Sequence, residues 1–297
     1  MELSDIYIYA LKELRGFDNE AIEIAIELAK NDIVETIDEF VDFLNFNIED
    51  QKFPQISQTY DIKIIKNAVE CARKNQHLIH RVNDDDTLYP KKLKLVHIDN
   101  VRALFYKGNL KNINHKTIMI TGSPTSTNEA KLAAKYFGKL FATEGYNILT
   151  TYSGQCEQSA FAGCSDASGI SIIFVQHNID KLSAKVMKAI QSDLEEEHAT
   201  IVSACNTSND VIPLDSFYRC LANLLDCLII PQLSFGDKIM QLVQMCIDMN
   251  KPVYLIKYKK AHVNEYDCAE ALQFLGANFL TSNTALKRVQ ATIGNAK

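Results

Sequence analysis

Hydrophobic positions follow two different periods along the chain. Within residues 20–45, apolar side chains recur every three or four positions, with charged ones between them. This spacing predicts amphipathic helices around a small core. Gly16 lies between two such stretches and is predicted to form a turn. The polar stretch 47–60, which contains Pro54, predicts a linker, and 62–74 predicts another helix.

The pattern changes near residue 116. From there, short runs rich in β-branched residues alternate with amphipathic stretches of helical length. Such alternation is typical of βαβ units, in which helices cover both faces of a parallel sheet. Because βαβ crossovers are right-handed, we expect an α/β fold: a Rossmann-like doubly wound parallel sheet, preceded by a small N-terminal all-helical domain. The predicted strands are 117–121, 147–150, 170–175, 199–203, 227–230 and 253–256, and the predicted helices are 128–143, 156–166, 181–196, 215–225, 236–250 and 264–275.

Charge is distributed unevenly. Residues 1–60 hold 4 Lys and Arg against 14 Asp and Glu, residues 61–110 hold 10 against 6, and residues 111–297 hold 17 of each. An acidic chain is a poor nonspecific partner for nucleic acid, although it can still carry a local basic groove. We expect three segments, namely an acidic helical domain (1–50), a linker and lead-in segment (51–115) and a Rossmann-like domain (116–297).

Composition places the chain among ordinary globular proteins. Of its 297 residues 47% are hydrophobic, but no apolar run approaches the roughly 18 residues of a membrane span. Residues 1–5 lack the basic and apolar regions of a secretory signal, so we expect a cytoplasmic protein without membrane contact. The eight cysteines are scattered without a C-x-x-C pair, which predicts reduced thiols and no metal site.

The first predicted strand-to-helix junction is a candidate anion site. Gly122 lets the backbone approach a ligand, and Ser123 and Thr127 offer hydroxyl groups. The free N–H groups of the following helix could hold a phosphate. The same stretch could instead only cap that helix, because Ser126 and Glu129 have the spacing of a capping box. Both interpretations stay open, whereas the missing G-x-G-x-x-G pattern argues against a dinucleotide site.

Three further junctions have a similar character. Ser153 and Gly154 follow the second predicted strand, and Gly236 lies in a turn after the fifth. Arg219 lies near the start of a predicted helix, where the helix dipole disfavours a cation. Either a bound anion or Asp215, one turn earlier, would resolve this conflict. Ligands of doubly wound sheets bind at the carboxyl ends of the strands, so these turns are expected to form one site.

Motifs before and after the first predicted strand carry a resemblance to a known family. Tyr89-Pro90-x-x-Leu93 is followed by Leu104-Phe105-Tyr106-Lys107-Gly108-Asn109-Leu110, and then by Gly122-Ser123. This order resembles the DNA-processing protein A family (DprA/Smf), and Gly276-Ala277 resembles its closing element, so that the resemblance covers about residues 80–283. It implies noncatalytic binding of single-stranded DNA in DNA uptake or recombination, help in loading a RecA-type recombinase, and a homodimer without cofactors.

The pocket motifs of that family are partly replaced. Pro124 stands where the family's first junction has Arg. Glu157 stands where its second junction has Asp, and Phe161 where a His follows. The Arg-Asn-Arg motif becomes Phe217-Tyr218-Arg219, which keeps only the last Arg. Two interpretations stay open: bases stack on these aromatic rings in place of some of the lost Arg contacts, or Phe217 and Tyr218 only pack the start of their helix.

The resemblance implies a binding protein and not an enzyme. The expected DNA- or phosphate-binding residues are Gly122, Ser123, Thr127, Ser153, Gly154, Arg219 and Gly236. The residues expected to stack on bases are Phe217, Tyr218 and Phe235. Further positive charge would come from Lys238, Lys257, Lys259 and Lys260. Two alternatives stay open: a protein that binds or hydrolyses a small nucleotide, with Glu157 as the candidate acid, and a degenerate scaffold that acts through protein contacts.

Overall fold

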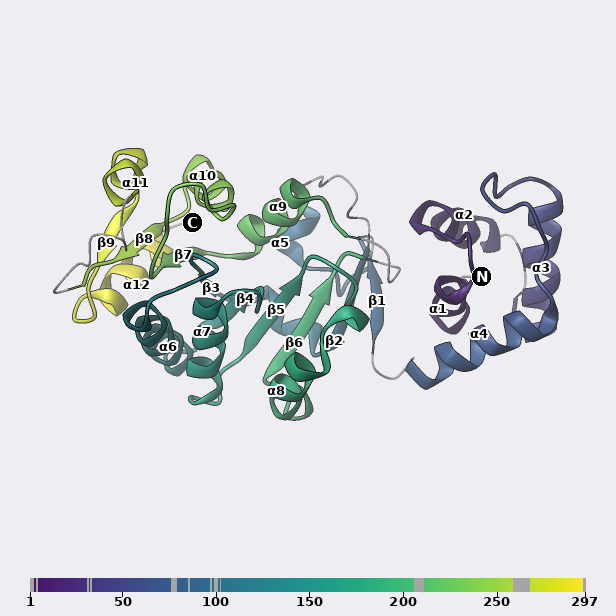
Figure 1. The fold of residues 1–297 in the computed structure, drawn as a ribbon, viewed down its shortest axis with the longest axis horizontal. Helices are drawn as coiled ribbons and strands as arrows, with labels where there is room; N and C mark the ends of the chain where they lie inside the picture. The colour runs from purple at the N-terminus through teal and green to yellow at the C-terminus, as the bar shows by residue number, and fades with distance from the viewer. Residues whose placement is uncertain are drawn as a thin grey trace. The chain divides into compact units, whose positions relative to one another are not determined.

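The chain folds into two compact units (Figure 1). One unit contains residues 1–81 with 177–181 and 205–211, and the other contains the rest of the chain. In the described part of the chain, no helix is long and apolar enough to cross a membrane. The computed structural model describes residues 3, 5–30, 32, 34–75, 79–84, 86–96, 98, 101, 103–205, 211–258 and 268–295.

Helices build the first unit. Thr36 caps α3 (Ile37–Glu49) in a reciprocal pair: its hydroxyl accepts from the Glu39 N–H at 3.2 Å, and the Glu39 carboxylate accepts from the Thr36 N–H at 2.8 Å. Phe53 and Ile56 are buried, so the polar stretch that we expected as a linker packs into this unit. The other helices are α1 (Asp5–Glu13), α2 (Asn19–Ala29) and α4 (Ile62–Asn75).

The two units divide near residue 81, whereas we expected boundaries at residues 50 and 115. Helix α4 packs against α1. The Tyr9 hydroxyl, on α1, donates to the Ile79 carbonyl oxygen at 2.6 Å, and this bond connects the chain after α4 to α1. Residues 51–81 therefore belong to the helical unit and do not form a separate lead-in segment.

A nine-stranded sheet forms the centre of the second unit. Its strands are β1 (His80–Asn83), β2 (Ala103–Gly108), β3 (Thr117–Ile120), β4 (Asn147–Thr150), β5 (Ser171–Val175), β6 (Ala199–Ser203), β7 (Cys227–Ile230), β8 (Val253–Ile256) and β9 (Asn278–Leu280). They lie in the order β1-β2-β6-β5-β4-β3-β7-β8-β9. Every pair of neighbouring strands in the part of this order that runs from β6 to β9 is parallel. Strand β2 runs antiparallel to β6.

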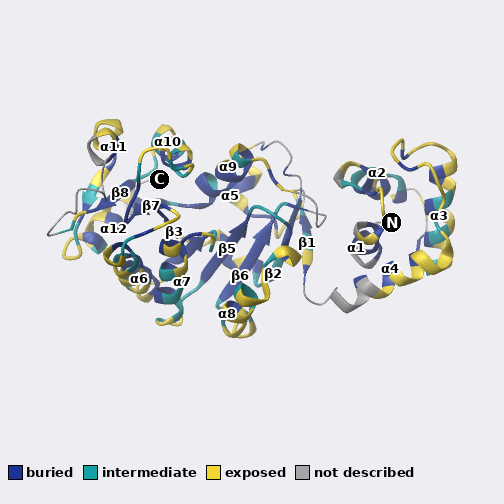
Figure 2. Ribbon diagram, in the orientation of Figure 1, coloured by how far each residue is buried: buried dark blue, intermediate teal, exposed yellow. Residues whose placement is uncertain are grey.

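The six strands that the sequence predicted are all present, and each is buried along its whole length (Figure 2). Strands covered on both faces have continuous apolar runs, which explains why the pattern found them. The helix expected over 236–250 begins later, at Met240. Of the helix expected over 264–275, the first residues, 264–267, lie outside the described residues.

Helices cover both faces of the sheet, which confirms the α/β architecture. α6 (Asn128–Thr143), α7 (Gln155–Ser165) and α12 (Ala285–Asn295) share one apolar cluster with the strands. α9 (Leu214–Leu224) and α10 (Met240–Asp248) lie on the opposite side of the strands (Figure 1). The remaining helices are α5 (Lys91–Lys94), α8 (Ala184–Glu195), α11 (Ala269–Leu275) and the 3₁₀ turns η1 (Leu110–Asn114) and η2 (Ile179–Lys181).

Two glycines let α6 and α7 approach each other closely. A Cβ at Gly138 would lie 2.3 Å from the Ala160 carbonyl oxygen, and one at Gly163 would lie 2.0 Å from the Lys135 carbonyl oxygen. Neither position has room for a side chain, because the obstacle is backbone. This contact fixes the position of α7, including its first turn, relative to α6.

The strand order reverses beside β3. The chain passes from β3 outward through β4, β5 and β6, and then returns so that β7 pairs with the other edge of β3. In open α/β sheets such a reversal leaves a crevice at the carboxyl ends of the strands. The candidate turns after β3, β4 and β7 all lie at that end.

Candidate functional site

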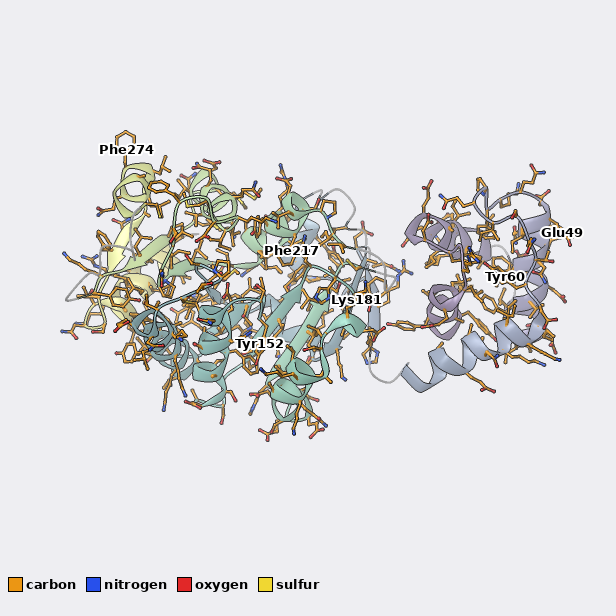
Figure 3. All side chains as sticks on the ribbon, viewed as in Figure 1. Glu49, Tyr60, Tyr152, Lys181, Phe217 and Phe274 are labelled. Atoms are coloured by element: carbon orange, nitrogen blue, oxygen red, sulfur yellow. The ribbon has the colours of Figure 1, made fainter. Side chains whose placement is uncertain are left out.

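A cavity of about 490 Å³ lies where the strand order reverses, at the carboxyl ends of β3, β4, β5 and β7. Phe217 on α9 forms part of its wall, and Tyr152 lies in the turn after β4, between two further lining residues (Figure 3). The volume suits a small ligand or one unit of a larger one. The cavity is lined by Gly122, Pro124, Thr151, Ser153, Gly154, Glu157, Gln176, Leu214, Phe217, Tyr218, Gly236, Asp237, Lys238 and Ile239.

The turn after β3 is tied to the chain that follows β7. The Ser123 N–H donates to the Gln232 carbonyl oxygen at 2.9 Å, and the Thr127 N–H donates to Gln232 Oε1 at 2.8 Å. A Cβ at Gly122 would lie 2.5 Å from the Gln232 carbonyl oxygen. A side chain at Gly122 would therefore push the two turns apart, and glycine brings the backbone to the cavity as expected.

The hydroxyl groups of this turn have partners within the protein. Thr127 caps α6, because its Oγ1 accepts from the Ala130 N–H at 3.2 Å. The cap is therefore Thr127 and not Ser126, which donates instead to the Ser123 carbonyl oxygen at 2.8 Å. Ser123 and Thr127 lie outside the lining of the cavity.

The turn after β4 reaches the cavity with small residues. Ser153 and Gly154 line it as expected, and the Thr151 and Ser153 hydroxyl oxygens lie 2.6 Å apart. Tyr152 has a φ of 57°, a left-handed conformation that is costly for a residue with a side chain. Its ring packs edge-on against Phe161 on α7, with the ring centres 5.3 Å apart, and so anchors the turn to that helix.

Glu157 is a buried carboxylic acid in the cavity wall. The residue is only 3% exposed, and the Thr121 hydroxyl donates to its Oε1. Burial raises the pKa of this carboxyl group, and the Thr121 hydroxyl and the backbone N–H groups of Glu157, Gly122 and Gly154 oppose the rise. Its Oε2 has no hydrogen-bond partner among the described residues. A buried unpaired oxygen with a shifted pKa marks a candidate functional group.

Helix α9 supplies the aromatic part of the wall. Phe217 and Tyr218 line the cavity and are buried, with their ring centres 5.9 Å apart. Phe217 also packs against Phe174 of β5, at 5.8 Å between ring centres. Burial raises the pKa of the Tyr218 hydroxyl, and the nearby Glu157 carboxylate raises it further.

Arg219 lies outside the cavity lining. Its Nε donates to Asp215 Oδ2 at 2.7 Å, and the two side chains are 55% and 63% exposed. Of the two explanations for a cation near this helix start, the structure shows the Asp215 partner. Exposed pairs four residues apart on a helix contribute only about 0.3–0.5 kcal/mol, so a phosphate could displace Asp215 at small cost.

The turn after β7 completes the wall. Gly236 lines the cavity with a φ of 86°. Asp237 Oδ2 accepts from the Ser123 hydroxyl at 2.5 Å and from the Ser234 N–H at 3.1 Å. Phe235 is 59% exposed and lies outside the lining.

The lining of the cavity contains more acidic than basic side chains. Among its described lining residues, Glu157 and Asp237 are acids and Lys238 is the base. Two helices begin at its wall: Gly154 and Pro213, the N-cap residues of α7 and α9, have no side chain that could cap. The positive ends of these helix dipoles offset part of the negative charge.

The structure places six of the ten expected site residues in one wall, namely Gly122, Ser153, Gly154, Phe217, Tyr218 and Gly236. The four outside the lining are Ser123, Thr127, Arg219 and Phe235. Among the lysines considered for charge, Lys238 lines the cavity and Lys257 Nζ lies 5.9 Å from the centre of the Phe279 ring. Lys259 and Lys260 lie outside the described residues.

Sequence reasoning missed part of the wall. Gln176 directly follows β5, so the rule that ligands bind at the carboxyl ends of strands would have found it. Asp237 lies in a turn that was noticed for its glycine, but nothing local in the sequence shows that its carboxylate reaches Ser123. The other missed residues are Pro124, Thr151, Leu214 and Ile239.

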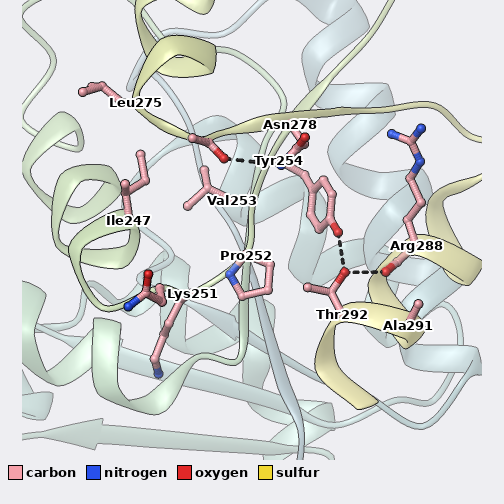
Figure 4. A pocket seen from close by; sticks show the side chains of 12 residues that line it. Ile247, Lys251, Pro252, Val253, Tyr254, Leu275, Asn278, Arg288, Ala291 and Thr292 are labelled. Carbon is pink, nitrogen blue, oxygen red and sulfur yellow. Dashed lines mark hydrogen bonds between the residues drawn. The ribbon is translucent and has the colours of Figure 1, made fainter. Parts of the chain in front are cut away.

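A second cavity, of about 620 Å³, lies at the opposite ends of β8 and β9 (Figure 4). Its cations are engaged with backbone: Lys251 Nζ donates to the Leu225 carbonyl oxygen at 2.5 Å, and the Arg288 guanidinium donates to the Phe279 carbonyl oxygen at 2.8 Å. It also lies at the amino ends of parallel strands, away from the usual ligand sites of such sheets. The cavity beside β3 is therefore the better candidate.

Comparison with known proteins decides the family. The family model described as DNA recombination-mediator protein A matches residues 80–288. The chain belongs to this family. The resemblance found in the sequence motifs is thereby confirmed. No curated protein matches the chain in sequence.

Two solved structures of DNA processing protein A share the fold of this chain. The X-ray structure of the Streptococcus pneumoniae protein has a TM-score of 0.62 and 16% identity, over 97% of this chain and 98% of that chain. A structure of the Helicobacter pylori protein, which concerns its single-stranded DNA binding mode, has a TM-score of 0.59 and 16% identity, over 73% of this chain and 96% of that chain. Both confirm the α/β fold class.

Proposed function

We propose that this chain binds single-stranded DNA at the cavity beside β3 and catalyses no reaction on the strand. The observation that carries the proposal is that a chain of the DNA recombination-mediator family has a cavity at the reversal of strand order, where ligands of such sheets bind. The role would be in DNA recombination or uptake in the cytoplasm, with the strand passed to a RecA-type recombinase by a homodimer of this chain.

Phosphate groups are expected at the rim of the cavity, by which we mean the exposed residues Arg219, Phe235, Gly236 and Lys238. Arg219 and Phe235 directly neighbour the lining residues Tyr218 and Gly236 in sequence, and Lys238 is itself a lining residue. Cations at an exposed rim can meet a flexible backbone, and the exposed Phe235 ring offers a face for a base. The rim thus combines charge and an aromatic face.

Fluorescence anisotropy of a labelled oligo-dT strand across a salt series tests the proposal. Affinity should fall with salt, and Lys238→Ala and Arg219→Ala should each weaken binding. Each lost phosphate contact should lower the slope of log K against log salt by about 0.7. Lys139→Ala is the matched control, because Lys139 is an exposed lysine in the last turns of α6, outside the cavity and its rim.

Absence of binding at low salt would reject the DNA proposal for this chain. Light scattering of the intact protein tests the homodimer, whose mass should be twice that of the 33.5 kDa chain. Capture of a purified RecA-type recombinase on the strand-bound protein tests the proposed transfer.

A small nucleotide is the second candidate ligand. The observation that favours it is enclosure: Glu157 lies buried in the wall of a cavity large enough for one nucleotide, and nearby wall residues are aromatic. Calorimetric titration with mononucleotides, beside the oligo-dT strand, separates the two candidates.

A further inference from the structure

Glu157 fills the position where a doubly wound sheet commonly holds an anion. It lies in the first turn of α7, next to Gly154, and the backbone N–H groups of Glu157, Gly122 and Gly154 lower the pKa of its carboxyl group against the larger opposite effect of burial. N–H groups from two turns and a helix N-terminus form a typical cradle for a phosphate. Here the protein supplies its own carboxylate, so a ligand phosphate cannot occupy the same place.

The two oxygen atoms of the Glu157 carboxyl group differ in their hydrogen bonds. Oε1 accepts from the Thr121 hydroxyl, whereas Oε2 lacks a hydrogen-bond partner among the described residues. A buried acceptor without a partner is costly, and a donor from a ligand would remove the cost. The neighbour of Oε2 is Gly154, which also lines the cavity: a Cβ there would lie 2.3 Å from Oε2.

The surroundings of Glu157 select among ligand groups. The second acid in the described lining, Asp237, disfavours an anion inside the cavity, and the Phe217 and Tyr218 rings in the wall favour a planar group. Together these features suit a flat, uncharged group that donates hydrogen bonds. In nucleic acids that description fits the amino-bearing edge of a base, since a carboxyl oxygen of Glu accepts well from the cytosine amino group.

We propose that the cavity takes up a nucleobase that carries an exocyclic amino group, and that the Glu157 carboxyl group turns toward the cavity so that Oε2 accepts from this amino group. The base comes either from a strand bound at the rim, in which case the inference rests on the proposed function, or from a free nucleoside. In both cases Glu157 acts as a specificity-determining residue and not as a phosphate ligand.

Oligo-dC and oligo-dU strands of equal length provide the sharpest test with the full chain. Their backbones are identical, and the two bases differ on one edge, where cytosine has an amino group at position 4 beside an unprotonated N3 and uracil has a carbonyl group at position 4 beside an N3–H. Wild type should bind oligo-dC about fivefold or more tightly, within the range for one discriminating base contact. Titration calorimetry with deoxycytidine and deoxyuridine tests the free-nucleoside source in parallel.

Two variants tie the preference to Glu157. Glu157→Gln keeps the shape, but its amide oxygen takes the Thr121 hydroxyl and its NH₂ group replaces Oε2, so the preference for cytosine should vanish or reverse. Gly154→Ala should also abolish it by placing a methyl group against Oε2. Glu129→Gln is the matched control, because it removes a carboxylate from the first turn of the neighbouring α6 outside the cavity, and it should keep the wild-type preference.

The outcomes separate this inference from the proposed function. If both strands bind equally well and neither nucleoside is preferred, the inference is overturned while the DNA proposal stands. If no strand binds but deoxycytidine binds in preference to deoxyuridine, the DNA proposal fails and the inference stands with a free nucleoside as ligand. A cytosine preference that survives in both Glu157→Gln and Gly154→Ala also overturns the inference that Glu157 selects the base.

Discussion

The Ser123 hydroxyl donates a hydrogen bond of 2.5 Å to Oδ2 of Asp237, a residue 114 positions later in the chain. This bond joins the turn after β3 to the turn after β7 across the reversal of strand order. Both turns contribute residues to the cavity wall, so the bond holds the two sides of the cavity together at this point.

Loss of the Ser123–Asp237 bond is expected to lower stability and to loosen the cavity. Ser123→Ala should reduce the free energy of unfolding by about 1–2 kcal/mol, because the bond has a charged acceptor and is partly buried. Denaturant unfolding measures the change. A double-mutant cycle with Asp237→Asn should show that the two losses are not additive. Full additivity would mean that the two side chains do not act on each other.

Removal of the Asp215 carboxylate beside Arg219 is expected to strengthen DNA binding. Asp215→Asn removes an exposed partner whose contribution to stability is small, so unfolding should change by less than about 0.5 kcal/mol. The lost negative charge should raise the affinity for oligo-dT severalfold at low salt, and the gain should shrink as salt increases. Anisotropy titrations of Asp215→Asn and of the double variant Asp215→Asn/Arg219→Ala measure this. An equal gain in the double variant would show that Arg219 does not meet the strand.

The close contact between α6 and α7 predicts a large effect from a single methyl group. In Gly163→Ala the new Cβ would lie 2.0 Å from the Lys135 carbonyl oxygen, so the helices must move apart. Overpacking of this kind costs about 1–3 kcal/mol, despite the higher helix propensity of alanine. Thermal or denaturant unfolding beside Lys139→Ala, an exposed site on the same helix pair, gives the comparison. A Gly163→Ala protein as stable as wild type would contradict this packing.

The buried Glu157 carboxyl group predicts a pH dependence of stability. Its pKa is raised by burial above its ordinary value of 4.5, so the folded state holds the proton to higher pH than the unfolded state does. The contribution to stability is therefore complete below pH 4.5 and is lost as pH rises through the folded pKa.

Glu157→Gln cannot titrate at this position and provides the reference. Relative to Glu157→Gln, the unfolding free energy of wild type should fall as pH rises from 4.5, by at most about 1.4 kcal/mol per pH unit. Denaturant unfolding of both proteins over the same pH series measures the difference, in which all shared groups cancel. A difference that rises or stays flat with pH would argue against a buried proton on Glu157.

The fold could be predicted from the sequence where burial leaves a simple signal. β3 to β8 are covered on both faces, so each is a continuous apolar run that the pattern finds. Three strands were missed: β1 and β9 mix exposed and buried positions within three or four residues, too few to show a period, and β2 is buried only in its first three residues. The stretch 47–60 was taken as a linker because its two buried anchors, Phe53 and Ile56, are separated by polar residues.

The site could be predicted in its backbone but only partly in its side chains. Gly122, Gly154 and Gly236 follow from the rule that turns at the carboxyl ends of strands approach the ligand. Ser123, Thr127 and Arg219 were expected to bind phosphate, but their side chains have partners inside the protein. Two of those partners are local, whereas Asp237 is distant in sequence and becomes a neighbour only through the fold.

The antiparallel pairing of β2 with β6 has a consequence for how the protein can be divided. In the register Phe105↔Ser203 to Gly108↔Thr200, β2 occupies the outer hydrogen-bonding edge of a completely buried strand. A fragment that begins at residue 116, where the apolar runs suggest a domain, would leave the N–H and C=O groups at the outer edge of β6 without hydrogen-bond partners. An unpaired apolar edge strand pairs with strands of other molecules, so such a fragment should aggregate. A fragment that begins at residue 80, where the family match also starts, would carry its own edge protection.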